Sequence, residues 1–499
     1  MAALAKIGGT KMVNRRTFKS DVSFLEKISM GATGTIAVFN NLKEQGHTPV
    51  ELERGSRSFK IWKNIKIKRI RVPDILCVDC GKCIECRTKT KLEISMSHSQ
   101  VDPERGWDYG LDDNDFVAFV VCNRAGARPV DWRASELIQY VSVKDLRLAQ
   151  RDGRAILTKP KGAEEGFEIR IIWPATIANA SGNITSVSQD RIQYQRQADK
   201  RLITLRLLKK DKLLMPLVKN GNNIAVNQIL ASVVPVTFGF HCDKSASESH
   251  YIKLLSSTSL SKRYMAAKAL AFFDSPEASD SLVNKLNDSS EHIYVRLETG
   301  ASLAHRDDKR GYDFIEACLS DEYLQNRLES VIVLGEIAKG ASCQILVDTV
   351  LDNEQHPEIR AGAAWALGEL RNRGALNALI ESFTAVEESI RIEAARALAK
   401  LAQRFTPEII REFPLAHPAK RSGISWALSN AGKFTLQDML SLLMDDDARQ
   451  WVAYIIGTQD QQRYIYEIEQ LKTRDPEVYF AVTVLWKIMT SWIYKLEEY

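Results

Sequence analysis

The sequence predicts a multidomain protein with an α/β N-terminal domain, a β-rich middle domain and an all-α C-terminal solenoid. Residues 20–46 have the capping residues and one-sided apolar pattern of a helix, and short segments rich in β-branched residues follow. The next part of the chain consists of short β-rich runs broken by Gly, Asn, Pro and Ser. Beyond it, Ala- and Leu-rich units repeat at a near-constant spacing. We therefore expect three domains, at residues 1–130, 131–250 and 251–499.

The composition is that of an ordinary globular protein, with 45% hydrophobic and 26% charged residues among 499. The N-terminal stretch MAALAKIGGTKMVNRRTFKSD lacks the apolar core of a signal peptide, and no apolar run approaches the roughly 18 residues of a membrane-spanning helix. We therefore expect a cytoplasmic protein without a membrane partner. In that reducing compartment, the eight cysteines argue against a disulfide framework.

Positive charge is concentrated in the first half of the chain. Residues 1–130 hold 22 Lys and Arg against 15 Asp and Glu, residues 131–250 hold 18 against 12, and the remainder holds 28 against 36. The segment RSFKIWKNIKIKRIR at 57–71 suits a surface that faces phosphates, because Lys and Arg release condensed counterions on binding. A solvated strand face would show the same pattern. The residues that we expect to contact DNA are Lys66, Lys68, Arg69, Arg71, Lys91 and His98.

A basic residue opens each of the C-terminal units. The anchors are separated by 33, 31, 33, 31, 30 and 28 residues, and they are Arg263, Arg296, Arg327, Arg360, Arg391, Arg421 and Arg449. Each unit combines an Ala/Leu-rich first helix, as in IRAGAAWALGEL, with a second helix such as ILVDTV. This pattern resembles HEAT repeats, including the short repeats of bilin lyases, over about half of the chain. The resemblance implies a solenoid, and its net negative charge favours a protein partner over DNA.

Two short motifs lie on the predicted strands that follow the N-terminal helix. PD at 73–74 ends one strand, ECR at 85–87 lies on the next, and a further strand, DFVAFVVC, follows at 115–122. Together with the order of helix, β-meander and strand, these motifs resemble the core of PD-(D/E)XK nucleases, the restriction-endonuclease type. Because side chains alternate along a strand, one face of the second strand should carry Cys83, Glu85, Arg87, Lys89 and Lys91.

The resemblance to these nucleases implies a catalytic site. In that family, carboxylates on adjacent strands, here Asp74 and Glu85, hold Mg²⁺, which polarises the scissile phosphate and activates water. A lysine near the second carboxylate orients the nucleophile, but the matching position here is Arg87. Lys89 lies one step further along the same face, about 6.6 Å away, and could take that role. An ordinary hairpin with a surface Glu–Arg pair would carry the same pattern.

Four cysteines at a three-residue step suggest a zinc site in the same hairpin: Cys77, Cys80, Cys83 and Cys86. The sequence CVDCGK forms a zinc knuckle, because C-x-x-C-G bends the backbone so that two thiolates converge on one ion. If residues 83–91 form a strand, however, Cys83 and Cys86 point to opposite faces. His98 or Cys122 could then complete the site.

An iron–sulfur cluster and unligated thiols remain alternatives to zinc, although the spacing differs from the ferredoxin pattern. The scattered cysteines are expected to be inert thiols of the core. They are Cys242, Cys318 and Cys343.

These features together favour a metal-dependent DNA endonuclease with catalytic Mg²⁺, structural Zn²⁺ and HEAT repeats that recruit a partner. By analogy, such a pairing suits microbial defence against foreign DNA or DNA repair. The alternative is a non-catalytic adaptor that binds nucleic acid through a zinc-stabilised basic domain. A third hypothesis, a lyase or isomerase of tetrapyrroles, follows from the repeat subtype, but no cysteine or aromatic array on the repeats supports it.

Overall fold

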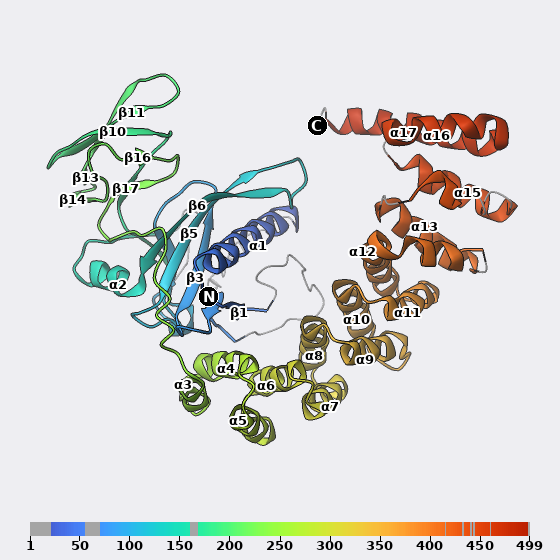
Figure 1. Ribbon diagram of the computed structural model, residues 1–499, viewed down its shortest axis with the longest axis horizontal. Coiled ribbons are helices and arrows are strands. Elements are labelled where there is room, and N and C mark those ends of the chain that lie inside the picture. Colours follow the sequence, from blue (N-terminus) through green and yellow to red (C-terminus); the bar gives the residue numbers. More distant parts are fainter. Residues whose placement is uncertain are drawn as a thin grey trace, which may run out of the picture. The chain divides into compact units, whose positions relative to one another are not determined.

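The computed structural model describes residues 21–54, 70–159 and 168–497, except for a few positions. These exceptions are Leu415, Gly432, Lys433, Leu440, Ser441, Leu443, Met444 and Asp460. The chain forms two compact units, one of residues 1–61 and 71–247 and the other of residues 62–70 and 248–499. Figure 1 shows a unit built mainly of strands and a unit built of stacked helices.

The first unit is built around a mixed five-stranded sheet with the order β1-β2-β3-β5-β6. Its strands are β1 (Pro49–Glu51), β2 (Ile75–Cys77), β3 (Cys83–Lys89), β5 (Phe116–Arg124) and β6 (Trp132–Ser142). Strands β1, β2 and β3 form an antiparallel meander, and β3 pairs with β5 in parallel. The predicted order of helix, meander and further strand is confirmed for these described elements.

Helix α1 (Asp21–Glu44) covers one face of this sheet (Figure 1). Its apolar side chains Val38, Phe39 and Leu42 form a core with Ile84 and with buried residues of β5 and β6. Cys86 packs against the same core. The even-numbered positions of β3 therefore face the helix, as the alternation of the strand predicts.

A crossover connects the parallel strands β3 and β5, as parallel pairing requires. It contains β4 (Ser95–Ser99) and a 3-10 turn, η1 (Pro103–Arg105). Strand β4 leaves the main sheet and pairs with β8 (Glu168–Ile172), which also pairs with β7 (Ile156–Thr158). Helix α2 (Val143–Arg151) follows β6, and its Leu146 carbonyl accepts a hydrogen bond from the indole of the fully buried Trp173.

The rest of the first unit consists of short strands. They are β9 (Ala175–Ile177), β10 (Gly182–Val187), β11 (Arg191–Arg196), β12 (Leu202–Arg206), β13 (Leu208–Lys209), β14 (Lys212–Leu213), β15 (Met215–Pro216), β16 (Asn223–Ile224) and β17 (Ile229–Ser232). The expected boundary after residue 130 falls between β5 and β6, which are hydrogen-bonded neighbours in one sheet. The β-rich stretch therefore belongs to the same compact unit as the N-terminal sheet, whereas the expected boundary near residue 250 lies close to the observed one.

The second unit is a solenoid of short antiparallel helices. Its helices are α3 (Glu248–Leu254), α4 (Leu260–Ala269), α5 (Pro276–Asn287), α6 (Ile293–His305), α7 (Lys309–Ala317), α8 (Leu324–Ile337), α9 (Gly340–Leu351), α10 (Pro357–Leu370), α11 (Leu376–Glu381), α12 (Glu388–Glu412), α13 (Pro418–Ala431), α14 (Leu436–Met439), α15 (Asp446–Gly457), α16 (Gln461–Arg474) and α17 (Pro476–Glu497). Helix α12 contains a kink at Phe405, which has non-helical backbone angles and precedes Pro407. The kink divides α12 into the two helices that one repeat requires.

Each anchor arginine is the fourth residue of the first helix in its repeat, from Arg263 in α4 to Arg449 in α15. Their guanidinium groups bind the loops around them. Arg296 donates to the carbonyl of Leu286, and Arg360 donates to that of Val350, at 2.9 and 3.0 Å. In six of the seven repeats the anchor arginine donates to a backbone carbonyl six to ten residues before it, so the period in the sequence reflects guanidinium groups that satisfy backbone carbonyls.

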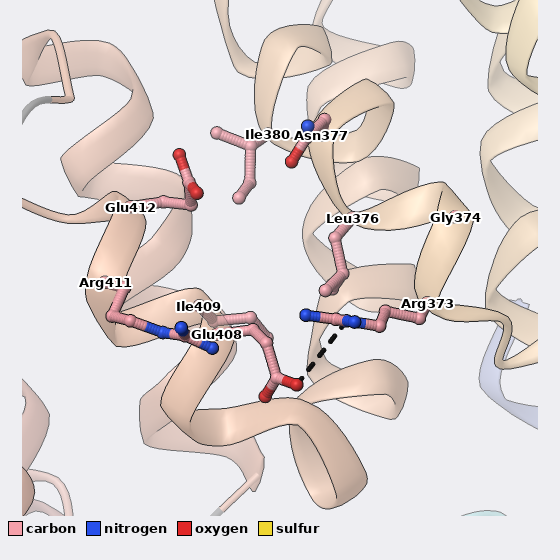
Figure 2. A pocket seen from close by; sticks show the side chains of 9 residues that line it. All are labelled: Arg373, Gly374, Leu376, Asn377, Ile380, Glu408, Ile409, Arg411 and Glu412. Atoms are coloured by element: carbon pink, nitrogen blue, oxygen red, sulfur yellow. Dashed lines mark ion pairs between the residues drawn. The ribbon is translucent and has the colours of Figure 1, made fainter.

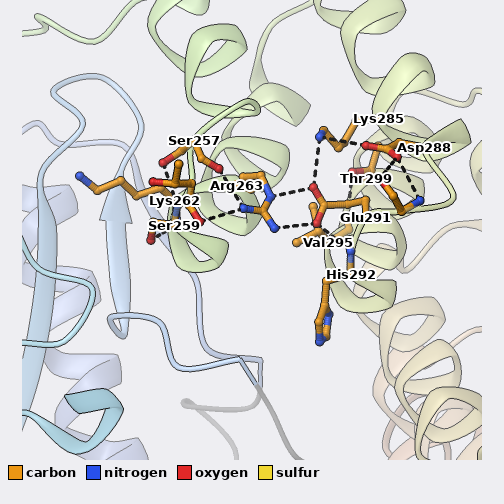
Figure 3. A network of polar contacts seen from close by, with 12 residues as sticks. Ser257, Ser259, Lys262, Arg263, Lys285, Asp288, Glu291, His292, Val295 and Thr299 are labelled. Carbon is orange, nitrogen blue, oxygen red and sulfur yellow. Dashed lines mark hydrogen bonds and ion pairs between the residues drawn. The ribbon is translucent and has the colours of Figure 1, made fainter.

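Four of these arginines also bind a polar side chain in the loop that opens the following repeat. The pairs are Arg263–Glu291, Arg327–Gln355, Arg421–Asp445 and Arg449–Asp475. Figure 3 shows the first of them, in which Arg263 lies between Glu291 and the carbonyl of Ser257. Each of these four contacts ties one repeat to the next.

Within the described ranges, no helix combines the length and apolar character that crossing a bilayer requires.

Candidate functional site

A cluster of one imidazole and three thiols lies at one end of the meander. His47 follows the C-terminal end of α1, Cys77 is the last residue of β2, and Cys80 lies in the turn that leads to β3. Cys242 comes from the segment that precedes α3. Among the residues that the structure describes, these four are the group of His, Cys, Asp and Glu side chains whose ligand atoms all lie within 4.8 Å of one another.

The spacing of the ligand atoms fits a tetrahedral metal ion. The Sγ atoms of Cys77 and Cys242 are 3.8 Å apart, and Nδ1 of His47 lies 3.3 Å from Sγ of Cys77 and 3.9 Å from Sγ of Cys80. Zn–S bonds of about 2.3 Å and Zn–N bonds of about 2.0 Å give tetrahedral edges of about 3.8 Å between sulfurs and about 3.5 Å between sulfur and nitrogen. Three cysteines and one histidine, three of them buried, are a donor set that could hold a metal ion such as zinc.

Neighbouring groups orient these ligands. Nε2 of His47 is 3.0 Å from the carbonyl oxygen of Phe240, so we place the proton on Nε2 and the lone pair of Nδ1 toward the thiols. The Cys80 thiol lowers the pKa of Cys77, and the His47 ring and the backbone N–H of Thr48 lower it further against the effect of burial. Lys82 forms an ion pair of 2.9 Å with Asp243, and this contact holds the segment that contains Cys242 beside the turn between β2 and β3.

The observed ligand set differs from the expected one in half of its members. Cys77 and Cys80 belong to it, but Cys83 and Cys86 do not. The reason is the alternation of β3, which turns Cys86 to the core under α1 while Cys83 lies on the opposite face. Cys122 is also part of the core under α1, so it cannot complete the set.

The two other members come from distant parts of the chain. His98 was one expected completion, but its Nδ1 accepts a weak hydrogen bond from the backbone of Trp107. Cys242, which we expected to be an inert core thiol, lies in the cluster instead. His47 and Cys242 are 30 residues before and 165 residues after Cys77. No local spacing connects them to the knuckle, so the sequence offers no signal for either of them.

A second group of polar side chains lies on the face of the sheet opposite α1. Asp74 directly precedes β2, and its Oδ2 accepts a hydrogen bond of 2.7 Å from the backbone N–H of Cys86 on β3. Burial raises the pKa of Asp74 well above its usual range, and the carboxylates of Glu85 and Glu53 raise it further. Burial likewise raises the pKa of Glu85, against the opposing effect of Arg87. The Glu85 carboxylate thus disfavours the charged form of Asp74.

Two basic residues continue this face along β3. Arg87 pairs with Glu85 at 3.0 Å, and its Nε atom is buried without a partner in the described part of the chain. Nζ of Lys89 donates to the carbonyl of Ser95 at 3.0 Å. Burial lowers the pKa of Lys89 to about 8, and the cations Arg87 and Arg170 lower it further. Such a lysine loses its proton more readily than an ordinary surface lysine.

The expected DNA-contacting residues are distributed unevenly. Lys66, Lys68 and Arg69 lie outside the described residues. Arg71 is exposed and donates to the carbonyl of Glu104 at 2.8 Å. Lys91 is exposed two residues after the end of β3 and lines a pocket, and His98 lies on β4 beside Trp107.

The solenoid has a pocket of about 360 Å³ between α11 and the end of α12 (Figure 2). Leu376, Ile380 and Ile409 supply its apolar side chains. Arg373 and Glu408 form an ion pair of 3.5 Å at one side. This combination of apolar and charged side chains is typical of a surface between neighbouring repeats.

Comparison with known proteins supports the repeat half of the chain. The family described as HEAT repeats matches residues 349–410. No curated protein matches the sequence. The chain and its sites therefore define a protein that joins a mixed α/β unit with a His/Cys cluster to a solenoid of HEAT type.

Solved structures with low similarity include repeat proteins of several kinds. A HEAT-like repeats protein from the archaeon Thermococcus onnurineus NA1 is 16% identical, with a TM-score of 0.24 over 43% of this chain and 97% of that one. The complex of CpcE and CpcF of phycocyanin lyase from Nostoc sp. PCC7120 is 16% identical, with a TM-score of 0.24 over 48% and 94%. A designed armadillo repeat protein in complex with the peptide (KR)4 is 17% identical, with a TM-score of 0.23 over 42% and 98%.

Proposed function

We propose that the first unit is a metal-dependent endonuclease of DNA and that the solenoid connects it to a protein partner. The observation that carries the proposal is the position of Asp74 and Glu85 beside the adjacent strands β2 and β3, with the buried Lys89 further along β3. Such an enzyme, coupled to a partner-binding surface, suits defence against foreign DNA or DNA repair.

The chemistry of these residues fits a divalent cation. The pKa values of Asp74 and Glu85 are raised by burial, and for Asp74 also by the neighbouring carboxylates, so a cation between them would relieve an existing repulsion. Mg²⁺ held there would polarise a phosphoryl oxygen and activate water. Lys89 would orient that water, and its lowered pKa would let it accept a proton near neutral pH.

One contact favours a second candidate, the non-catalytic adaptor. Arg87 forms a direct ion pair with Glu85 at the position where the nuclease family carries lysine. An arginine does not lose its proton in proteins, so this pair neutralises Glu85 permanently unless a cation displaces it. In the adaptor, Arg87 and Lys89 would contact phosphates, and no bond would be cleaved.

Cleavage assays distinguish the two candidates. Supercoiled plasmid and single-stranded DNA would be incubated with the full chain and Mg²⁺ or Mn²⁺, next to Asp74→Asn and Glu85→Gln. Glu136→Gln on β6 is the matched control, because it removes an exposed carboxylate of the same sheet. The endonuclease requires loss of cleavage by about 100-fold or more in both site variants and none in the control. Equal residual cleavage in all four proteins would assign it to a contaminant and support the adaptor.

A further inference from the structure

A pocket of about 490 Å³ lies in the first unit, next to the end of β3. Its lining comes from the segment between β3 and β4, from β8 and the residues that follow it, and from the turn between β13 and β14. This volume lies within the range of about 300–1,000 Å³ that small-molecule pockets occupy. None of the residues that line the pocket belongs to the His/Cys cluster.

The charged residues of this pocket are mostly cations. Four of them, Lys91, Arg170, Lys209 and Lys210, face one acid, Glu93, which leaves an excess of three positive charges. Glu93 is already paired with Arg170. Burial lowers the pKa of Lys209, Glu93 opposes this effect, and the nearby Lys210 and Lys91 lower the pKa further. A pocket lined by an excess of cations attracts an anion.

Two of these lysines have their donors available. Lys91 and Lys210 are exposed and make no side-chain hydrogen bond or ion pair with the described residues. Lys209 uses one donor on the carbonyl of Ala175, at 2.7 Å, and retains two. Several ammonium groups acting as point charges suit a phosphate better than a single carboxylate.

The other wall of the pocket is apolar. It includes Ile172, Pro174 and Ile177, above the fully buried indole of Trp173. A ligand that fits both walls carries a flat apolar group close to an anion. A nucleotide has this form, because one sugar separates its aromatic base from its phosphate. An inorganic anion would use only the cationic half.

The pocket is also connected to the candidate catalytic face. The Oγ atom of Ser95 accepts a hydrogen bond of 3.0 Å from the guanidinium of Arg170, which lines the pocket, and lies 3.4 Å from Nζ of Lys89. One serine therefore joins the two sets of side chains. A nucleotide in the pocket would place its phosphate-linked neighbour toward β3.

We propose that this pocket binds one nucleotide, with the phosphate on Lys91, Lys209 and Lys210 and the base against Ile172, Pro174 and Ile177. The assignment of that nucleotide to the DNA strand at the β3 face rests on the proposed endonuclease function. Binding of the nucleotide itself does not, because the pocket is defined by its own contacts.

The test is binding to the full chain in EDTA, so that cleavage plays no part. The probes are dAMP, deoxyadenosine, inorganic phosphate and a fluorescent single-stranded 12-mer, and affinity is measured by calorimetry or polarisation. The variant is Lys91→Gln with Lys210→Gln, both exposed, and the control is Lys219→Gln, an exposed lysine of the same unit outside the pocket. We expect the double variant to bind dAMP about tenfold or more weakly and the control to bind as wild type does.

Each outcome decides one point. Parallel loss of dAMP and 12-mer binding supports a nucleotide of the substrate strand, and loss of dAMP binding alone supports a free nucleotide as ligand. Equal binding of dAMP by the double variant and Lys219→Gln would overturn the proposal that this pocket binds the nucleotide. If inorganic phosphate binds as tightly as dAMP, the base contributes nothing to binding, and the pocket is an anion site and not a nucleotide site. Because no cleavage is measured, an inactive endonuclease site would not change these results.

Discussion

Nδ1 of His47 lies 3.3 Å from Sγ of Cys77, although the two residues are 30 positions apart. The carbonyl oxygen of Phe240 accepts a hydrogen bond from Nε2 of the same ring, and Cys242 follows Phe240 by two residues. A metal ion at this point would therefore tie three segments of the first unit together: the end of α1, the turn after β2, and the chain that leads toward α3. That role is structural, since all four ligand positions are filled by protein.

We expect the purified protein to carry about one zinc ion per chain, and His47→Ala or Cys242→Ser to lose most of it. The reason is that a tetrahedral site with three ligands binds far more weakly and opens to water. Metal analysis of the native protein and titration of its thiols check this. Cys318→Ser, in the solenoid core, is the control and should retain zinc. Loss of zinc in Cys83→Ser, with retention in His47→Ala, would contradict the ligand set.

The Arg263–Glu291 pair gives a prediction for the solenoid. The Glu291 carboxylate is almost fully buried and accepts hydrogen bonds from Arg263 at 2.7 and 3.0 Å and from Lys285 at 3.1 Å. Glu291→Gln removes the charge that two partly buried cations need, so we expect a loss of roughly 2–4 kcal/mol of unfolding free energy. Lys309→Gln, which breaks an exposed pair with Asp313, should cost less than about 0.5 kcal/mol. Urea unfolding followed by circular dichroism measures both.

The same contact predicts how stability depends on pH. Burial alone would raise the pKa of Glu291, but Arg263, the backbone N–H of His292 and Lys285 outweigh it, so the pKa is lowered in the folded state. The Glu291 carboxylate therefore adds to the unfolding free energy above the pKa of about 4.3 that it has in the unfolded chain. This stabilisation is lost as the pH falls through the lower pKa of the folded state. Thermal unfolding from pH 7 to pH 3 should show a smaller acid-induced drop in Glu291→Gln than in wild type. Identical pH profiles would contradict this assignment.

The sequence was most informative where its signal is periodic. The spacing of the anchor arginines predicts the repeats, and in the structure each anchor is the fourth residue of a helix. Alternation along β3 predicts which side chains share a face, since a strand has a fixed period of two. Both patterns depend only on local geometry.

The parts that the sequence did not predict depend on long-range contacts. His47 and Cys242 meet only because the sheet brings the end of α1 and the segment after β17 to the same turn. The boundary between the expected first and second domains was placed at a change of composition, but hydrogen bonds between β5 and β6 cross it. Strand pairing across a turn leaves no signature in composition. The cationic pocket likewise collects residues from three separate segments.

The packing of α1 on β3 can be tested at one glycine. A Cβ atom on Gly34 would lie 1.9 Å from Oγ1 of Thr88, so Gly34→Ala should force the helix away from the sheet at a cost of about 1–3 kcal/mol. Gly31→Ala in the same helix meets nothing within 4 Å and should be neutral or stabilising by up to about 1 kcal/mol, because alanine favours helices. Adding Thr88→Ala to Gly34→Ala should restore part of the loss. Chemical denaturation of wild type, Gly34→Ala, Thr88→Ala and the double variant measures this coupling, and additive effects of the two substitutions would exclude the contact.

A prediction for the carboxylate face separates stability from activity. Asp74→Asn keeps an acceptor for the backbone N–H of Cys86 and removes one of the charges that repel Glu85. Without metal, we expect this variant to be at least as stable as wild type while it loses cleavage. Mg²⁺ at 10 mM should raise the melting temperature of wild type but not that of Asp74→Asn. Glu136→Gln is again the control, and an equal Mg²⁺ response in all three proteins would argue against a site at Asp74.

The last prediction concerns which half of the chain binds nucleic acid. Residues 1–250 carry an excess of 13 positive charges, from 40 Lys and Arg against 27 Asp and Glu, whereas residues 251–499 carry an excess of 8 negative charges. The repeat arginines do not compensate, because those such as Arg296 and Arg360 use their guanidinium donors on carbonyls inside the solenoid. A fragment of residues 1–247 should therefore bind duplex DNA within about threefold of the full chain. Its log Kd should change with log salt concentration by about 0.9 for each phosphate contacted, since binding releases counterions.

A fragment of residues 248–499 is the matched comparison, and it should bind DNA at least about 100-fold more weakly at the same salt concentration. Polarisation with a labelled 20-base-pair duplex, at several salt concentrations, measures both fragments and the full chain. Circular dichroism must show that each fragment is folded, since the cut after residue 247 separates the two compact units. Tight binding by the folded solenoid fragment would mean that local rows of basic side chains outweigh its net negative charge. The DNA-binding role would then belong to the repeats, and the cationic pocket of the first unit would serve a free nucleotide.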